Sequence, residues 1–253
     1  MPRTRAPRNP ELIAAQIVRA VTRGQYPPGS MLPQEEEMCQ TFGVARNTIR
    51  EALRILETQG VISVRPGRYG GPTVLPPNVD SIVSGLRIFL GQEGAVFEEL
   101  LEARIAVERA LAYRAASNID SEQLEILEDL ASKMEEEDCP LPRFVELNLA
   151  MHGQIAEASN NRVLQALQLA IRTMQGTSVS AHYSSEDRSD VIADHRKIID
   201  AIRAKDPDGA EEAMGRHLHN FLVFMRNEHP TVLAQRLEPL MPATEFGTFG
   251  AEP

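Results

Sequence analysis

Four side chains in the second half of the chain have types and spacings that suit a metal ion. Asn148 and His152 are four residues apart, so on a helix both point to the same side. His195 and His217 follow on two later segments. Three neutral imidazoles and one oxygen donor suit a divalent transition metal such as zinc, nickel or manganese. Six histidines in 253 residues is an ordinary number, so by spacing alone surface or hydrogen-bonded core histidines remain the alternative.

Helices must position these four residues. From residue 79 onward no segment has the pattern of a strand, and apolar stripes of helical period are separated by Gly, Asn and Pro. We expect helices near 79–90, 95–117, 121–137, 141–159, 160–181, 188–204 and 207–228. This pattern predicts an antiparallel helical bundle, whose core is the usual place for a buried small-molecule or metal site.

Residues 32–71 have a different pattern: a helix, a tight turn, a second helix and a two-stranded wing. Gly43 is expected to end the first of these helices and the second to run from about Arg46 to Gln59. A further amphipathic helix is expected over 10–23, before the motif. This order of elements predicts a winged helix-turn-helix, so the chain as a whole is expected to be mainly α with one small β wing.

Polar residues of the second motif helix have the chemistry to bind DNA. Arg46, Asn47 and Arg50 lie near its N-terminal end and away from its apolar side. Arginine can bond guanine O6 and N7 in bidentate fashion, and a helix N-terminus favours phosphate. The expected wing strands, 61–64 and 73–75, enclose a glycine-rich turn with two more arginines that can approach a sugar-phosphate backbone. A solvated arginine face is the alternative.

The charge is divided unevenly along the chain. The net charge of −10 argues against nucleic-acid binding, but residues 1–76 hold ten Arg and six Glu, a net charge of +4, and the remainder carries −14. A basic end can supply phosphate contacts, and an acidic remainder limits non-specific binding. We expect domains at 8–76 and 79–228 and a loose tail at 229–253. The sequence has no signal peptide and no long apolar run, so we expect a cytoplasmic protein without a membrane span. The two cysteines fit a reducing compartment and have no metal or redox spacing.

The first domain resembles the winged helix-turn-helix of the GntR family of bacterial transcription regulators. The resemblance is carried by the leading helix, the run GVARNTIREALRILETQG over residues 43–60 and the glycine-rich wing. It implies binding of a double-stranded DNA operator. The residues that fall at DNA-contacting positions are Glu35, Arg46, Asn47, Thr48, Arg50 and Gly67, with Arg68 added because Glu36 stands where the family usually has a basic residue.

The second half resembles the all-helical effector-binding FCD domain of the FadR branch of that family. ELLEARIAVE over residues 99–108, NLAMHGQIAEASNN from 148, DHRKIIDAI from 194 and AMGRHL from 213 carry the resemblance. It implies a metal held by Asn148, His152, His195 and His217, with Asn148 in place of the common aspartate. It also implies that Arg104 contacts a small carboxylate effector, an intrahelical pair with Glu108 being the alternative for this arginine.

These resemblances together predict a homodimeric, ligand-responsive repressor that reads an inverted-repeat operator. The alternatives are a metal-dependent enzyme with a DNA-binding appendage and a metal-free regulator that senses an organic acid. Three histidines with open coordination positions could activate water. Against an enzyme, the sequence has no HExxH or nucleophile motif, so we expect a protein that is not an enzyme.

Overall fold

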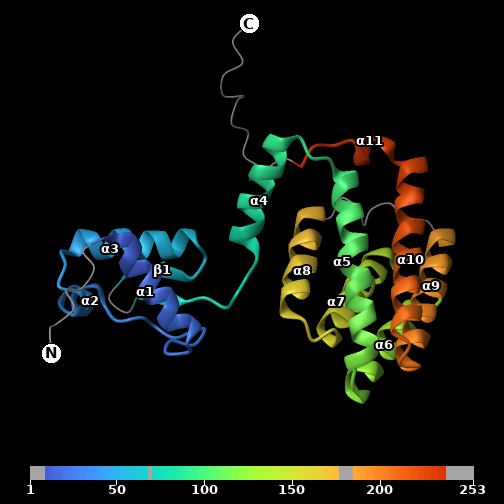
Figure 1. Cartoon of the computed structure of the whole chain (residues 1–253), viewed down its shortest axis with the longest axis horizontal. Helices are drawn as coiled ribbons and strands as arrows, with labels where there is room; N and C mark the ends of the chain where they lie inside the picture. Colours follow the sequence, from blue (N-terminus) through green and yellow to red (C-terminus); the bar gives the residue numbers. More distant parts are fainter. Residues whose placement is uncertain (1–8, 68–69, 177–184, 238–253) are drawn as a thin grey trace, which may run out of the picture. The chain divides into compact units, whose positions relative to one another are not determined.

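The computed structural model describes residues 9–67, 70–176 and 185–237, with the side chains of 185–187 excepted. The chain divides into two compact units, Met1–Ser81 and Ile82–Pro253 (Figure 1). Each unit has a cluster of buried apolar side chains. The fold is mainly helical, with one small sheet in the first unit, as the sequence predicts.

The described residues of the first unit, 9–67 and 70–81, form three helices and a β hairpin. They are α1 (Pro10–Thr22), α2 (Glu35–Phe42), α3 (Arg46–Thr58), β1 (Ile62–Arg65) and β2 (Gly71–Val74). The two strands pair antiparallel, with Ile62 opposite Val74. The order is that of the predicted winged helix-turn-helix, and the strands lie one or two residues from their expected bounds.

Local chemistry explains where these helices begin and end. The side chain of Asn9 caps α1 by accepting a hydrogen bond from the backbone N–H of Glu11 at 2.9 Å. Gly43 ends α2 in the left-handed conformation, with φ of 64°, which glycine adopts without the steric cost that a side chain brings. The unit's core joins the apolar faces of α1 and α3 through residues such as Ile13 and Ile49, both fully buried.

The second unit is a helical bundle. Its helices are α4 (Asp80–Glu93), α5 (Phe97–Asn118), α6 (Ser121–Met134), α7 (Leu141–Ala158), α8 (Arg162–Gln175), α9 (Ser185–Arg203), α10 (Pro207–Glu228) and the short α11 (Pro230–Leu233). α4 begins two residues before the boundary between the units. The seven helices expected from residue 79 onward correspond to α4–α10, and most ends differ by at most three residues. The helix expected over 160–181 is the exception, because α8 ends at Gln175, and residues 177–181 lie outside the described residues.

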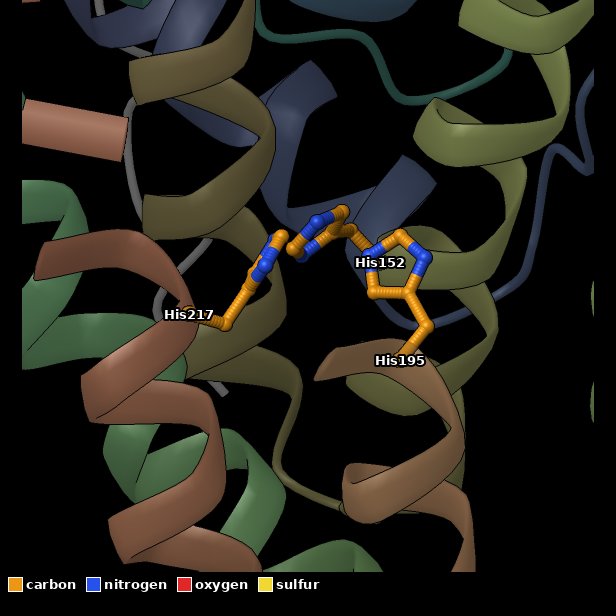
Figure 2. A group of neighbouring side chains, drawn as sticks. All are labelled: His152, His195 and His217. Atoms are coloured by element: carbon orange, nitrogen blue, oxygen red, sulfur yellow. The ribbon is translucent and has the colours of Figure 1, made fainter. Parts of the chain in front are cut away.

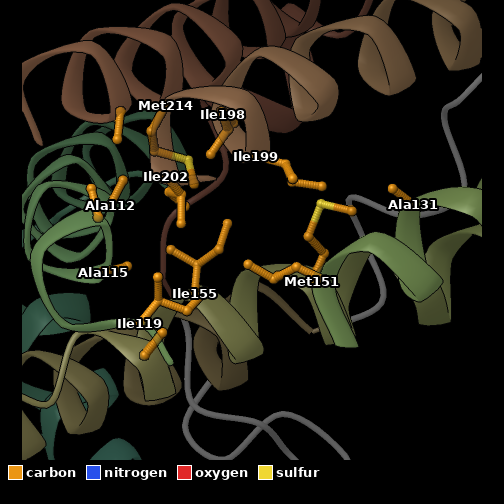
Figure 3. Packing of buried hydrophobic residues seen from close by; sticks show 14 of the residues in the cluster. Ala112, Ala115, Ile119, Ala131, Met151, Ile155, Ile198, Ile199, Ile202 and Met214 are labelled. Atoms are coloured by element: carbon orange, nitrogen blue, oxygen red, sulfur yellow. The ribbon is translucent and has the colours of Figure 1, made fainter. Parts of the chain in front are cut away.

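One apolar cluster forms the core of the bundle. It contains side chains of α5, α6, α7, α9 and α10, among them Ile155, Ile199, Ile202 and Met214 (Figure 3). On α9 the buried face runs through His195, Ile198, Ile199 and Ile202, at the spacing of one helical side. His195 therefore lies about one turn from the buried isoleucines on the same face of α9, so a buried polar side chain adjoins the apolar core.

The expected loose tail is in part ordered, which corrects that prediction for residues 229–237. α11 follows α10, and Val96 forms a β bridge with Arg236. Leu233 and Leu237 are buried, and a Cβ on Gly91 would lie 2.8 Å from the carbonyl oxygen of Leu237. Apolar side chains and backbone pairing thus hold the first part of the expected tail. Residues 238–253 lie outside the described residues.

No helix in the described part of the chain combines the length and the apolar character needed to cross a membrane.

Candidate functional site

The first unit has a groove between α3, the second helix of the helix-turn-helix, and the wing formed by β1 and β2. The groove, of about 510 Å³, is lined by the start of α2, by α3 and by the wing. Of the residues expected to contact DNA, Glu35, Arg46, Arg50 and Gly67 line it. Arg65 of β1 lines the groove as well, so three arginines surround it. Arg65 is one of the two arginines that the sequence places in the wing turn.

The apolar spacing of α3 determines which residues face this groove. Ile49, Ala52, Leu53 and Leu56 are buried, and this fixes the rotation of the helix. Arg46 and Asn47 are exposed in its first turn, and Thr48 is half-buried. The N-cap residue, Ala45, offers no side-chain hydrogen bond, so the first-turn amides of α3 are not capped by it.

Glu35 holds Arg50 in place across the helix-turn-helix. The Nε of Arg50 donates to the Glu35 carboxylate at 3.0 Å, with the two side chains 54% and 31% exposed. An exposed pair of this kind contributes only about 0–1 kcal/mol to stability, so its main effect is on the direction of the guanidinium. Arg68 lies outside the described residues.

The wing is attached to the recognition helix by a side chain that the sequence analysis did not single out. Glu57 of α3 accepts a hydrogen bond from the backbone N–H of Val64 at 3.0 Å. On the other side of the hairpin, Gln34 lies against the wing backbone near Gly70 and Gly71. These contacts link wing and recognition helix within the first unit.

In the second unit, three histidines from three helices meet. His152 of α7, His195 of α9 and His217 of α10 are buried, and one nitrogen from each ring lies within 4.8 Å of the others (Figure 2). The ring centroids of His195 and His217 are 4.6 Å apart, and each lies 5.4 Å from that of His152. Within the described part of the chain this is the group of His, Cys, Asp and Glu that is suited to a metal.

Ring nitrogens of these histidines are available to bind a metal ion. Burial lowers the pKa of His195 and of His217 well below the ordinary value, and the nearby His152 and Arg104 lower the pKa of both further. Both rings are therefore neutral near neutral pH, the form that binds metals. Both ring nitrogens of His195 and the Nε2 of His152 are buried without a hydrogen-bond partner. Such groups are rare in proteins, and they fit a divalent metal as the missing partner.

A buried carboxylate adjoins this cluster. Glu108 of α5 contacts Nδ1 of His152 with one oxygen and accepts from Nε of Arg104 at 2.5 Å with the other. Burial raises the pKa of Glu108, but the charge of Arg104 and the contacts with Arg104 and His152 outweigh this and bring it to about 2. From the sequence, Glu108 was expected only as a possible partner for Arg104. A contact with a residue 44 positions away leaves no signal in helical spacing.

A cavity lies beside the two remaining predicted residues. It has a volume of about 530 Å³, and Arg104 and Asn148 line it together with Arg172 and Gln175. The Oδ1 of Asn148 and the Nε2 of Gln175 are buried and have no hydrogen-bond partner. Arg104 thus makes the intrahelical pair with Glu108 and also faces a cavity with unsatisfied polar groups. Arg172 and Gln175 were not expected from the sequence.

A second hollow, of about 370 Å³, reaches the cluster through His217. Asp194 lines it, with an oxygen 4.0 Å from Nδ1 of His217, too far for a hydrogen bond. Asp194 is engaged instead by Lys197 at 2.9 Å and by Asn220 at 3.1 Å.

Both units of the chain match known protein families. The profile described as "Bacterial regulatory proteins, gntR family" matches residues 10–69, and that of the FCD domain matches residues 99–220. The galactonate operon transcriptional repressor of Escherichia coli (strain K12) is 30% identical over 207 residues, which are 79% of this chain and 90% of that protein. The chain belongs to the GntR family. Its pairing of a GntR domain with an FCD domain is consistent with the FadR subfamily.

Further relatives of this GntR-family chain agree. The HTH-type transcriptional repressor NanR of Cronobacter sakazakii is 28% identical over 219 residues, 83% of this chain and 82% of that protein. The solved structure of Streptococcus agalactiae GntR is similar with a TM-score of 0.69 and 28% identity, over 85% of this chain and 99% of that one. The chain is thus a transcription regulator with an FCD domain and not an enzyme, which sets aside the enzyme alternative.

Proposed function

We propose that this GntR-family chain is a repressor that leaves its operator when a small carboxylate binds in the FCD domain beside a divalent metal. The observation that carries the proposal is a buried cluster of three histidines with unsatisfied nitrogens, in the same domain as a cavity lined by Arg104. The names of the relatives support repression.

The DNA contacts would come from the groove of the first unit. Arg46 and Arg50 would read base edges from the start of α3, and Asn47 and Thr48 would contact the backbone or bases beside them. Glu35 would direct Arg50, and Gly67, exposed at the wing turn with φ of 113°, would allow close approach to phosphate. We add Arg68 to this set on the basis of its place in the wing.

The metal would be held by His152, His195 and His217, with the amide oxygen of Asn148 as a fourth donor. Asn148 lies one turn before His152 on α7, and its oxygen lacks a partner. A bound zinc, nickel or manganese ion would supply a positive centre that attracts a carboxylate oxygen. Because an amide brings no charge, we expect weaker metal binding here than with an aspartate at this position.

The effector would occupy the cavity lined by Arg104 and Asn148. Arg104 and Arg172 offer guanidinium groups to a carboxylate, and the unsatisfied amide of Gln175 suits a hydroxyl or carbonyl oxygen. The relative named for a galactonate operon supports a carboxylate with hydroxyl groups as the class to test first.

A homodimer would bring two winged units to the two halves of an inverted repeat. Exposed apolar side chains support an interface between copies: Ile82 and Phe89 on α4 are 63% and 57% exposed, and Val163 on α8 is 70% exposed. Effector binding would change operator affinity only by favouring one dimer arrangement over another. α4, which starts at the boundary between the units, is the element through which we expect this coupling to pass.

Two measurements test the proposal. Native mass spectrometry with elemental analysis of the purified protein should show a dimer with bound divalent metal. An operator selected from random duplexes should be released on titration with galactonate or a related sugar acid, and Arg104→Met should still bind the operator but release it only at much higher concentrations. Arg109→Met, an exposed arginine of the same helix, is the control. A wild-type response in Arg104→Met would rule out Arg104 as the sensor.

A further inference from the structure

Glu108 occupies a position that no ordinary ion pair requires. It is 3% exposed, and each of its two oxygens has a separate partner: Nε of Arg104 on the same helix and Nδ1 of His152 on α7. An ion pair with Arg104 at the protein surface would use one carboxylate oxygen of Glu108 and would not require Glu108 to be buried. The second oxygen is directed at one of the three histidines of the cluster.

This contact determines which nitrogen of His152 can bind a metal. An ionised carboxylate only accepts hydrogen bonds, so Nδ1 of His152 must carry the proton. The lone pair is then on Nε2, the nitrogen that is buried without a partner in the protein. A carboxylate on the outer nitrogen also makes the imidazole a stronger ligand and fixes the orientation of its ring.

The other buried carboxylate of the region does not do the same for His217. Asp194 stands 4.0 Å from Nδ1 of that ring and is engaged by Lys197 and Asn220. Neither nitrogen of His195 has a partner. Among the described residues, His152 is therefore the histidine of this cluster that has a carboxylate within hydrogen-bonding distance.

We propose that Glu108 is the positioning residue of the metal site: it holds His152 with Nε2 free and supplies the negative charge near the cluster that Asn148 lacks. This inference rests on the proposed metal binding by the three histidines. It assigns to Glu108 a role beyond neutralising Arg104, and that difference can be measured.

The experiment measures the zinc dissociation constant of the full-length, metal-stripped protein by competition with a chromophoric chelator. Glu108→Gln should weaken zinc binding by about 10- to 100-fold, the usual effect of losing such an outer partner. Glu102→Gln is the matched control, because Glu102 is an exposed carboxylate of the same helix, 3.1 Å from Arg226. It should bind zinc as the wild type does.

A second pair of variants guards against misfolding, since Glu108→Gln leaves Arg104 buried beside a neutral amide. The double variant Arg104→Met/Glu108→Gln is compared with the single variant Arg104→Met. The two differ only at Glu108, and neither contains a buried arginine without a partner. The same 10- to 100-fold loss is expected between these two, with unchanged circular dichroism. If Glu108 serves only to neutralise Arg104, the two variants bind zinc equally, and the inference is overturned.

Imidazole nitrogen shifts in two-bond ¹H–¹⁵N spectra give a readout that a merely structural role would not produce. The metal-free wild type should show His152 protonated at Nδ1, and a proton on Nε2 instead would overturn the inference. If the wild type takes up no zinc at all, the metal part of the proposed function falls and the inference with it. If the wild type binds zinc and Glu108→Gln binds it equally well, the inference alone falls.

Discussion

Replacing Arg50 by alanine tests the proposed DNA contacts of the groove in the first unit and should have little effect on the fold. The side chain is 54% exposed, and its ion pair with Glu35 is of the exposed kind that contributes about 0–1 kcal/mol. The melting temperature should therefore change little. If Arg50 makes a bidentate contact with a base, its loss costs about 1–3 kcal/mol of operator binding, or about 5- to 150-fold in the dissociation constant.

The assay is fluorescence anisotropy with an operator selected by the wild type, at several salt concentrations. Loss of a base contact weakens specific binding and leaves the slope of log K against log salt unchanged, whereas loss of a phosphate contact reduces that slope by about 0.9. Arg109→Ala is the matched control: it also removes an arginine from a 3.0 Å exposed pair, with Glu211, but in the other unit. Equal operator affinities for Arg50→Ala and Arg109→Ala would refute the assignment of α3 as the recognition helix.

The remaining predictions concern the metal site, the core of the bundle and the turn that ends α2. His195→Ala should lower zinc content, because both nitrogens of that ring lack protein partners, and Asn148→Asp should raise zinc affinity by adding a charged ligand; equal metal content in both variants and the wild type would contradict the site. Ile199→Ala should lower the free energy of unfolding in urea by about 2–5 kcal/mol, and Ile126→Ala, 40% exposed, by much less; similar losses would mean that the core is misplaced. Gly43→Ala should cost about 1–2 kcal/mol from backbone strain alone, since nothing lies within 4 Å of its Cβ position; an unchanged melting temperature would argue against the left-handed turn.

Helices and turns whose bounds depend on residues close by in the sequence could be predicted. The period of Ile49, Leu53 and Leu56 fixes the buried side of α3 and so the exposure of Arg46, and Gly43 marks the turn before it. The helices of the bundle follow from the same local rules of period and capping. The DNA-binding half was therefore predicted almost to the residue, with strand ends off by one or two positions.

The prediction of a loose tail from residue 229 onward was wrong for residues 229–237. That prediction came from the Pro, Gly and Thr content of the last residues of the chain, which is a local property of the sequence. Burial of Leu233 and Leu237 and the bridge between Val96 and Arg236 involve partners more than a hundred residues away, which local pattern does not reveal.

The sequence by itself determined that His152, His195 and His217 lie on three different helices, but it left open whether they lie at the surface or in the core. The structure shows that all three are buried. Only the tertiary structure decided that their nitrogens come within 4.8 Å of one another and that Glu108 meets His152. Helical period sets the side on which a residue lies, but the packing of whole helices sets how far each is shifted along its neighbours. That shift comes from the combined contacts of the core, so it is a property of the folded bundle and of no single segment.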